Sequence, residues 1–279
     1  MKNSLKWQWL YQKKLYLLVF AIPFLVMYFV YSAFGVPPYG NSSVLVLDLN
    51  GQYVYYFEAF RDAVWGKSSM IYSWSRNLSG EMLGIYAYYL ASPFSLIPVL
   101  LPRGMMLGSL ELMELCKIGA AATTFAIYLK NRKQCKLFSM LIFSTTYALM
   151  AYSIVQMMNP MWIDGLIYLP LIIMGTERLV DEGRKLGLII PLALMFMANF
   201  YIGYMVGLFT GLYFLHYLFS REELLGVKAT LKTFVRFAVS AIVAAMCAMV
   251  IILPAYSSLK LGKMEFTQPD YTMKAQFSI

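Results

Sequence analysis

Long apolar runs recur along this chain, and they constrain its fold more than any other feature. A helix needs about 20 mostly apolar residues to cross a membrane, and seven stretches approach or exceed that length. They are residues 15–35, 104–129, 137–156, 166–180, 186–200, 204–219 and 234–256. Several are short, so we expect tilted helices or local thinning of the bilayer. The sequence therefore predicts an all-α polytopic membrane protein with about seven transmembrane helices.

The composition excludes most other classes of protein. Hydrophobic residues make up 60% of the 279 residues and charged residues only 13%, against about 45–50% and about 25% in soluble domains. A soluble fold of this size cannot hide so much apolar surface. We therefore exclude a soluble enzyme, a disordered chain and a nucleic-acid-binding domain. The net charge of +9 is interpreted as a signal of membrane orientation.

The basic residues indicate which ends of the spans face the cytoplasm. The N-terminal segment 1–14 holds four lysines, and a dense basic loop occupies residues 130–136. Cytoplasmic loops are enriched in Lys and Arg, so the N-terminus is predicted to be cytoplasmic. A cleaved signal peptide is the competing interpretation. It is disfavoured because the apolar run is long and no small-x-small cleavage site follows it.

One apolar segment, residues 86–101, is short and contains two prolines. If it crossed the membrane, every later loop would change sides and the basic loops would lie outside. We therefore expect it to lie in the interface, or to enter the membrane and return. This choice predicts a seven-span module at 15–256, a large outer loop at 36–103, and an extracytoplasmic tail at 257–279 that reads like the start of another loop.

Residues 53–64 of the outer loop have the apolar spacing of an amphipathic helix, with apolar side chains at 53, 56, 57, 60 and 64. Their tyrosine content favours a helix lying in the membrane interface. A helix packed on the bundle is the alternative interpretation.

Asp48 is the first carboxylate of the outer loop, and Asn50, Gln52 and Tyr53 follow it closely. Either Asp48 or Asn50 could cap the helix that follows, or Asp48 could act as a general base or charge holder at the membrane surface. Spacing alone favours the cap.

Other polar residues are predicted to gather at the same outer face. The outer loop supplies Arg61, Arg76, Glu81 and Arg103. The short outer turns supply Asn159, Trp162, Asp164, Asn199 and Tyr201. One polar outer site is the economical interpretation of this arrangement.

The second span carries the ionisable residues Glu111, Glu114 and Lys117. Such residues are costly inside a membrane and are functional candidates for that reason. Glu114 and Lys117 could pair on one helix face, so an ion pair that locks helix packing is the alternative to a catalytic role.

Several segments match a known family in order along most of the chain. They are Leu47-Asp48-Leu49-Asn50-Gly51-Gln52-Tyr53, the stretch 80–94, Asn159-Pro160-Met161-Trp162-Ile163-Asp164, Leu169-Pro170-Leu171, Glu177-Arg178 and Asn199-Phe200-Tyr201-Ile202-Gly203-Tyr204. They resemble the YfhO family of bacterial membrane proteins, which is implicated in glycosylating lipoteichoic acid or related cell-wall polymers. Members usually run longer, so we expect this chain to correspond to the front portion of the architecture.

The resemblance implies a GT-C-type glycosyltransferase in the bacterial plasma membrane. Such an enzyme takes a sugar from a polyprenyl-phosphate donor on the outer face, and an acidic residue near the start of the first outer loop is typical. Asp48 matches that position and is the expected base, with Asp164 and Glu114 as second-rank carboxylates. The expected partners of the donor phosphate are Arg61, Arg76 and Arg103. The other outer polar residues are the expected substrate-binding groups.

No cofactor is predicted. A divalent metal lacks support because no DxD-type acidic pair lies beside Asp48, and the three cysteines and one histidine show no metal-binding spacing. The expected partners are the lipid-linked donor, the polymer acceptor and membrane lipids.

Two other function classes stay open. A lipid or sugar transporter could use short spans interrupted by Pro191 and Gly203 as broken helices around a substrate. Against this class, no inverted repeat is evident in the sequence, and the polar residues gather at one face. A non-catalytic partner of a glycosylation complex is the third class.

Overall fold

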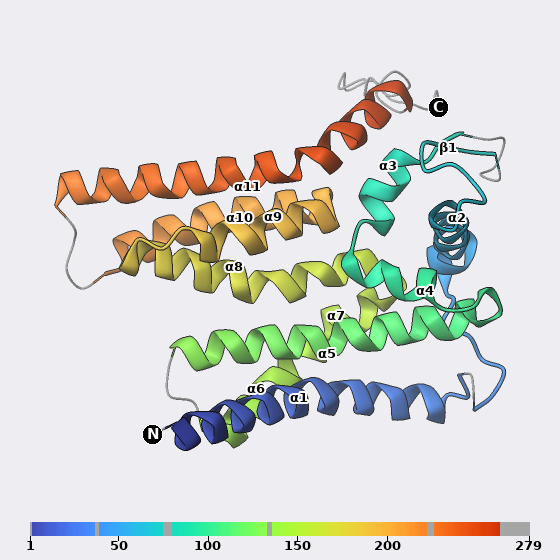
Figure 1. Cartoon of the computed structure of the whole chain (residues 1–279), viewed down its shortest axis with the longest axis horizontal. Helices are drawn as coiled ribbons and strands as arrows, with labels where there is room; N and C mark the ends of the chain where they lie inside the picture. Colours follow the sequence, from blue (N-terminus) through green and yellow to red (C-terminus); the bar gives the residue numbers. More distant parts are fainter. Residues whose placement is uncertain (1, 37–38, 75–79, 133–135, 222–225, 263–279) are drawn as a thin grey trace, which may run out of the picture.

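The structure, a computed structural model, describes residues 2–36, 39–74, 80–132, 136–221 and 226–262, with the backbone alone at 2–13 and 261–262. Figure 1 shows long helices running side by side, with shorter elements gathered at one end. Arg76, part of the basic loop and most of the predicted tail lie outside the described residues.

Each of the predicted apolar runs forms a helix. The long helices are α1 (Lys2–Ala33), α5 (Met106–Arg132), α6 (Leu137–Ala148) with the short α7 (Ala151–Val155), α8 (Ile163–Glu182), α9 (Leu186–Ala198), α10 (Phe200–Phe219) and α11 (Val227–Gly262). The described strands are limited to the two-residue pair β1 (Tyr72–Ser73) and β2 (Gly80–Glu81), so the fold is all-α, as predicted.

Five helical segments in the described part of the chain are long and apolar enough to cross a membrane. They are Lys14–Ala33, Arg103–Arg132, Leu137–Met158, Phe200–Phe219 and Val227–Lys260. The other two predicted spans, in α8 and α9, are not among these five segments. Helix α9 has only 13 residues, and α8 carries charged side chains at Asp164, Glu177 and Arg178.

The shorter elements lie at the end of the bundle opposite the start of α1 (Figure 1). They are the π-helical turns η1 (Leu49–Tyr53) and η2 (Tyr86–Leu90), the helices α2 (Val54–Val64), α3 (Leu83–Ile85) and α4 (Leu96–Leu100), and the 3-10 turns η3 (Pro93–Ser95), η4 (Arg103–Met105), η5 (Gln156–Met158) and η6 (Pro160–Trp162). We call this the loop end, and the end where α1 begins and α5 finishes the basic end.

The ambiguous apolar segment is broken rather than straight. Its two halves, Leu83–Leu90 and Pro93–Leu100, meet at an angle of 104°. Ser92 lies at the break between the two halves. Its side chain caps the second half by accepting a hydrogen bond from the Phe94 backbone N–H. Figure 1 places both halves at the loop end. The bend fits either a broken span or a re-entrant segment, so the predicted re-entrant or interfacial position stays a prediction.

Helix α5 is the central element of the first half of the bundle, contacting α1, α6 and α8. Helix α9 plays the same part in the second half, contacting α8, α10 and α11. A Cβ atom at Gly175 of α8 would lie 2.1 Å from the carbonyl oxygen of Gly187 on α9. Only glycine permits this approach, which is typical of helix packing in membranes.

Helix α2 is amphipathic, as its spacing predicts, and its apolar face is covered by protein. Phe57 and Phe60 are buried in a cluster that includes Val99 of α4 and Leu110 of α5. Tyr55, on the opposite face of α2, is exposed. The packing corresponds to the alternative that the sequence left open, a helix resting on the bundle.

Candidate functional site

A strained residue leads the backbone into Asp48. Leu47 has a φ of 47°, in the left-handed region that non-glycine residues rarely adopt. Such conformations cost about 1–3 kcal/mol and cluster at functional sites. Asp48 is exposed, and its side chain makes no capping hydrogen bond to the turn that follows. The cap interpretation of Asp48 is therefore wrong, because its carboxylate is not used to cap the turn that follows.

The hydroxyl of Tyr53 connects Asp48 to a distant part of the chain. It lies 3.4 Å from Oδ2 of Asp48 and 3.1 Å from Oδ1 of Asn159, which follows η5. Burial, helped by the neighbouring Tyr89 hydroxyl and the Asp48 carboxylate, raises the pKa of Tyr53. Tyr53 is therefore a protonated hydrogen-bond donor at neutral pH.

Two π-helical turns bring tyrosines together at the loop end. The ring centroids of Tyr53 in η1 and Tyr89 in η2 are 5.0 Å apart, and Tyr56 lies 5.1 Å from Tyr89. Tyr88 continues the array, 4.5 Å from Tyr89 and 5.6 Å from Phe200 of α10. The π-helix is rare and is found frequently at functional sites.

The predicted polar residues Asn159 and Trp162 lie between η5 and η6 and at the end of η6, respectively. Asn159 donates from Nδ2 to Oε1 of Gln156 at 2.9 Å, which orients the side-chain oxygen that receives the Tyr53 hydroxyl. Trp162 ends η6, is partly buried and packs against two of the three large core clusters. Asn50 and Gln52 are exposed next to Asp48, and Tyr56 lies within hydrogen-bonding reach of Gln52.

Asn199 is a structural residue rather than a surface contact. Its Oδ1 accepts from the Ile202 N–H at 2.8 Å and so caps α10, while its Nδ2 donates to the Tyr88 carbonyl at 2.8 Å. The side chain is buried. Asn199 thus fixes α10 against η2, and it leaves the exposed ring of Tyr201 6.0 Å from that of Tyr88.

Asp164 lies in a buried ion pair instead of lining the outer surface. Its Oδ2 is 2.5 Å from Nζ of Lys117, and its Oδ1 accepts from Ser92 at 2.7 Å. Lys117 also donates to the Pro160 carbonyl at 2.7 Å. The two side chains are 0% and 1% exposed. Every strong partner of Asp164 is structural, so the geometry does not bring it to Asp48.

The expected pair of Glu114 with Lys117 is absent from the ion pairs of the described residues. Glu114 instead accepts a hydrogen bond from Tyr31 of α1 at 2.8 Å, and its buried Oε1 has no partner. Lys117 instead donates to the Asp164 carboxylate of α8 and to the Pro160 carbonyl of η6. The alternative of a packing ion pair is therefore realised between helices α5 and α8.

The outer-loop cations and Glu81 are dispersed around the loop end. Arg103 is 61% exposed and lies 3.7 Å from Asp62. Arg61, on α2, keeps a buried Nε without a hydrogen-bond partner. Glu81 binds the Gly84 N–H at 2.7 Å and the Ser258 hydroxyl of α11, so it anchors the end of α11. The predicted role of Arg76 falls outside the described residues.

Sequence reasoning missed the contributions of Tyr31, Ser92 and Tyr89. Each has a polar group near a predicted site residue only through the fold, because its partners lie far along the chain. The sequence signal that points to η2 is its three tyrosines, Tyr86, Tyr88 and Tyr89. Within the described ranges, no group of three or more His, Cys, Asp or Glu side chains could hold a metal ion.

The fold and the site define a multi-pass helical membrane protein with a polar, tyrosine-rich site at one end of its bundle. The model of the family described as bacterial membrane protein YfhO matches residues 19–279, nearly the whole chain. The chain therefore belongs to the YfhO family, and the resemblance seen in the sequence is confirmed. Comparison with curated proteins and with solved structures finds no match.

Proposed function

We propose that this YfhO-family protein is a membrane glycosyltransferase of the GT-C type. It moves a sugar from a polyprenyl-phosphate donor to a hydroxyl of a cell-wall polymer, such as lipoteichoic acid, on the outer face of the plasma membrane. The supporting observation is the exposed carboxylate of Asp48 at the loop end, connected through Tyr53 to Asn159. A carboxylate so placed can meet a lipid-borne donor and a water-borne acceptor together.

The transfer step needs one base and one leaving group. The acceptor oxygen forms a bond to the anomeric carbon of the sugar, while the bond from that carbon to the donor phosphate oxygen breaks. The hydroxyl proton passes to Asp48, and polyprenyl phosphate leaves with the bonding electron pair. General-base catalysis of this kind contributes about 10²–10⁴-fold to the rate.

A cation near the donor phosphate would stabilise the charge that develops on it. Arg61 is partly buried, and its buried Nε has no hydrogen-bond partner. Arg103 is exposed and already lies near Asp62. Guanidinium groups bind phosphate in a bidentate way, so Arg61 is the first candidate to hold the leaving group.

The tyrosine array supplies a surface suited to the sugar and the acceptor. Tyr56, Tyr88 and Tyr89 are partly buried, and each combines an apolar ring face with a hydroxyl. The exposed amides of Asn50 and Gln52 lie on the same turn as Asp48. These groups offer stacking faces and hydrogen bonds without adding charge beside the base.

The test is sugar transfer by the purified protein in liposomes that contain a radiolabelled polyprenyl-phosphate sugar and lipoteichoic acid. We expect label to appear in the polymer. A protein that binds the donor but transfers no label to any polymer would contradict the proposal.

A lipid or sugar transporter is the second candidate, because Glu114 is buried inside α5 with one unpaired oxygen. The same liposomes distinguish the two functions. Movement of a fluorescent lipid-linked sugar between leaflets, without transfer, would favour the transporter.

A further inference from the structure

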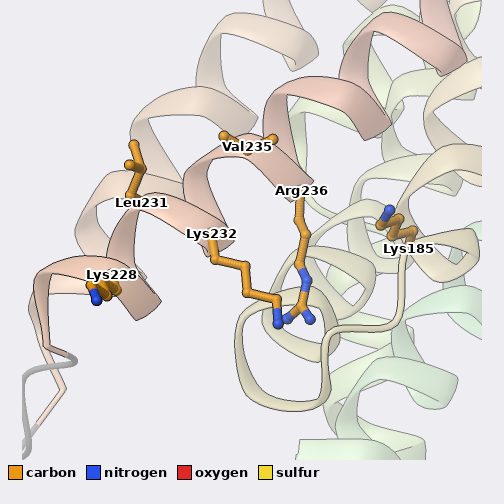
Figure 2. A pocket seen from close by; sticks show the side chains of 6 residues that line it. All are labelled: Lys185, Lys228, Leu231, Lys232, Val235 and Arg236. Carbon is orange, nitrogen blue, oxygen red and sulfur yellow. The ribbon is translucent and has the colours of Figure 1, made fainter.

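The basic end of the bundle carries a groove whose lining is basic and apolar but contains no acidic side chain. Its volume is about 600 Å³, and it lies between α11 and the start of α9. The lining residues are Lys185, Lys228, Leu231, Lys232, Val235 and Arg236 (Figure 2). The site proposed above lies at the loop end, so this groove has no part in it.

The groove is built on one face of α11. Lys228, Leu231, Lys232 and Val235 follow the i, i+3, i+4, i+7 spacing that brings side chains to one helix face. Figure 2 shows Lys232 and Arg236 pointing from α11 towards the turn that joins α8 and α9. Lys185 immediately precedes α9, so the positive end of that helix dipole adds to the field of the groove.

Gly183 makes room for the arginine of the groove. It ends α8 with a φ of 73°, and a Cβ atom there would lie 2.7 Å from Nη1 of Arg236. The guanidinium therefore rests against the turn between α8 and α9. The absence of a side chain at Gly183 leaves the space that the Arg236 guanidinium occupies.

The acidic residues in the last turn of α8 have other partners. Asp181 binds Arg221 at 2.9 Å, and Glu182 binds Arg184 at 2.8 Å. Among the residues that the structure describes, no ion pair involves any of the four cations of the groove. Glu222 and Glu223 lie outside those residues. The described groove therefore concentrates positive charge that its own walls leave uncompensated.

From this arrangement we propose that the groove binds the phosphate of an anionic phospholipid in the leaflet at the basic end. Basic pockets between transmembrane helices bind anionic lipid headgroups. Leu231 and Val235 are exposed on the same face of α11 as the lysines. They give an acyl chain an apolar surface directly beside the phosphate, which a soluble anion would not use.

The test measures lipid binding to the full chain purified in mild detergent, by native mass spectrometry. Phosphatidylglycerol, phosphatidylcholine and inorganic phosphate are titrated separately. We expect phosphatidylglycerol to bind at least about tenfold more tightly than phosphatidylcholine, and inorganic phosphate at the same concentrations not to displace it. Equal binding of the two lipids would overturn the proposal. Displacement by inorganic phosphate would show that the site takes a free anion, and it would overturn the lipid assignment.

Two variants of equal charge locate the binding. Lys228→Gln/Lys232→Gln leaves Arg236 and its packing intact, and it should weaken phosphatidylglycerol binding by about 30-fold, since each basic residue contributes about 1 kcal/mol. The control, Lys14→Gln/Lys136→Gln, removes two exposed cations at the same end but outside the groove. It should bind as the wild type does. Equal losses in both variants would show that binding follows net charge, and would overturn the proposal.

Discussion

The ammonium group of Lys117 on α5 lies 2.5 Å from the carboxylate of Asp164 on α8, and both side chains are buried. The pair joins two neighbouring helices. Lys117 also donates to the carbonyl of Pro160, the first residue of η6. Ser92 adds the broken segment through its hydrogen bond to Asp164. One ion pair thus connects α5, α8 and the break between η2 and η3.

Removing either partner of this pair should destabilise the protein strongly. Lys117→Met leaves an unpaired buried carboxylate, and Asp164→Leu leaves an unpaired buried ammonium, each costing about 3–5 kcal/mol. The double variant should be more stable than either single one, because no uncompensated charge remains. Thermal unfolding in detergent measures all three, and additive losses in the double variant would contradict the pairing.

Because α8 and α9 cross closely, we expect alanine substitutions at Gly175 and Gly187 to differ in their effect on stability. Gly175→Ala should lower stability by about 1–3 kcal/mol, because its new Cβ would meet the backbone of Gly187 at 2.1 Å. Gly187→Ala is the matched control, since its Cβ would meet only the Gly175 Cα at an ordinary 3.6 Å. Unfolding temperatures in the same detergent compare them. Equal losses would mean that the helices do not cross as described.

Asn199 is expected to stabilise the fold through two hydrogen bonds. Asn199→Ala removes the cap of α10 and the bond to the Tyr88 carbonyl, and it should cost about 1–3 kcal/mol. Asn199→Ser can still cap the helix but is too short to reach Tyr88, so its loss should be intermediate. Thermal unfolding ranks the variants, and a serine variant no better than the alanine one would argue against the capping role.

Tyr53→Phe should separate function from fold. The ring contact with Tyr89 remains, but the hydroxyl that meets Asp48 and Asn159 is lost. We expect sugar transfer to fall about tenfold or more, while stability changes by about 1 kcal/mol. Tyr55→Phe is the control, because Tyr55 is exposed on the adjoining helix α2. Equal activity in both variants would remove Tyr53 from the site.

The helices of the bundle could be predicted from the sequence because apolar length and periodicity are local properties. The apolar stripe of 53–64 predicted α2 in the same way. What covers that stripe was not predictable, because Val99 and Leu110 reach it only through the fold.

The polar contacts could likewise be predicted only where the partners lie close together in the sequence. Lys117 and Asp164 were both candidates, yet helical spacing suggests only partners on the same helix, so Glu114 was the expected partner of Lys117. Lys117 and Asp164 are separated by 47 positions along the chain, and no sequence pattern joins them. The left-handed backbone at Leu47 is equally invisible in the sequence, because leucine gives no sign of a positive φ.

The most direct test of the account is the transfer activity of Asp48→Asn in liposomes that hold the labelled polyprenyl-phosphate sugar and the polymer acceptor. Glu58→Gln, on the neighbouring helix α2, is the matched control. We expect Asp48→Asn to insert and fold normally but to lose about 10²-fold or more of the transfer rate, while Glu58→Gln should transfer sugar as the wild type does. Full activity in Asp48→Asn would contradict this expectation.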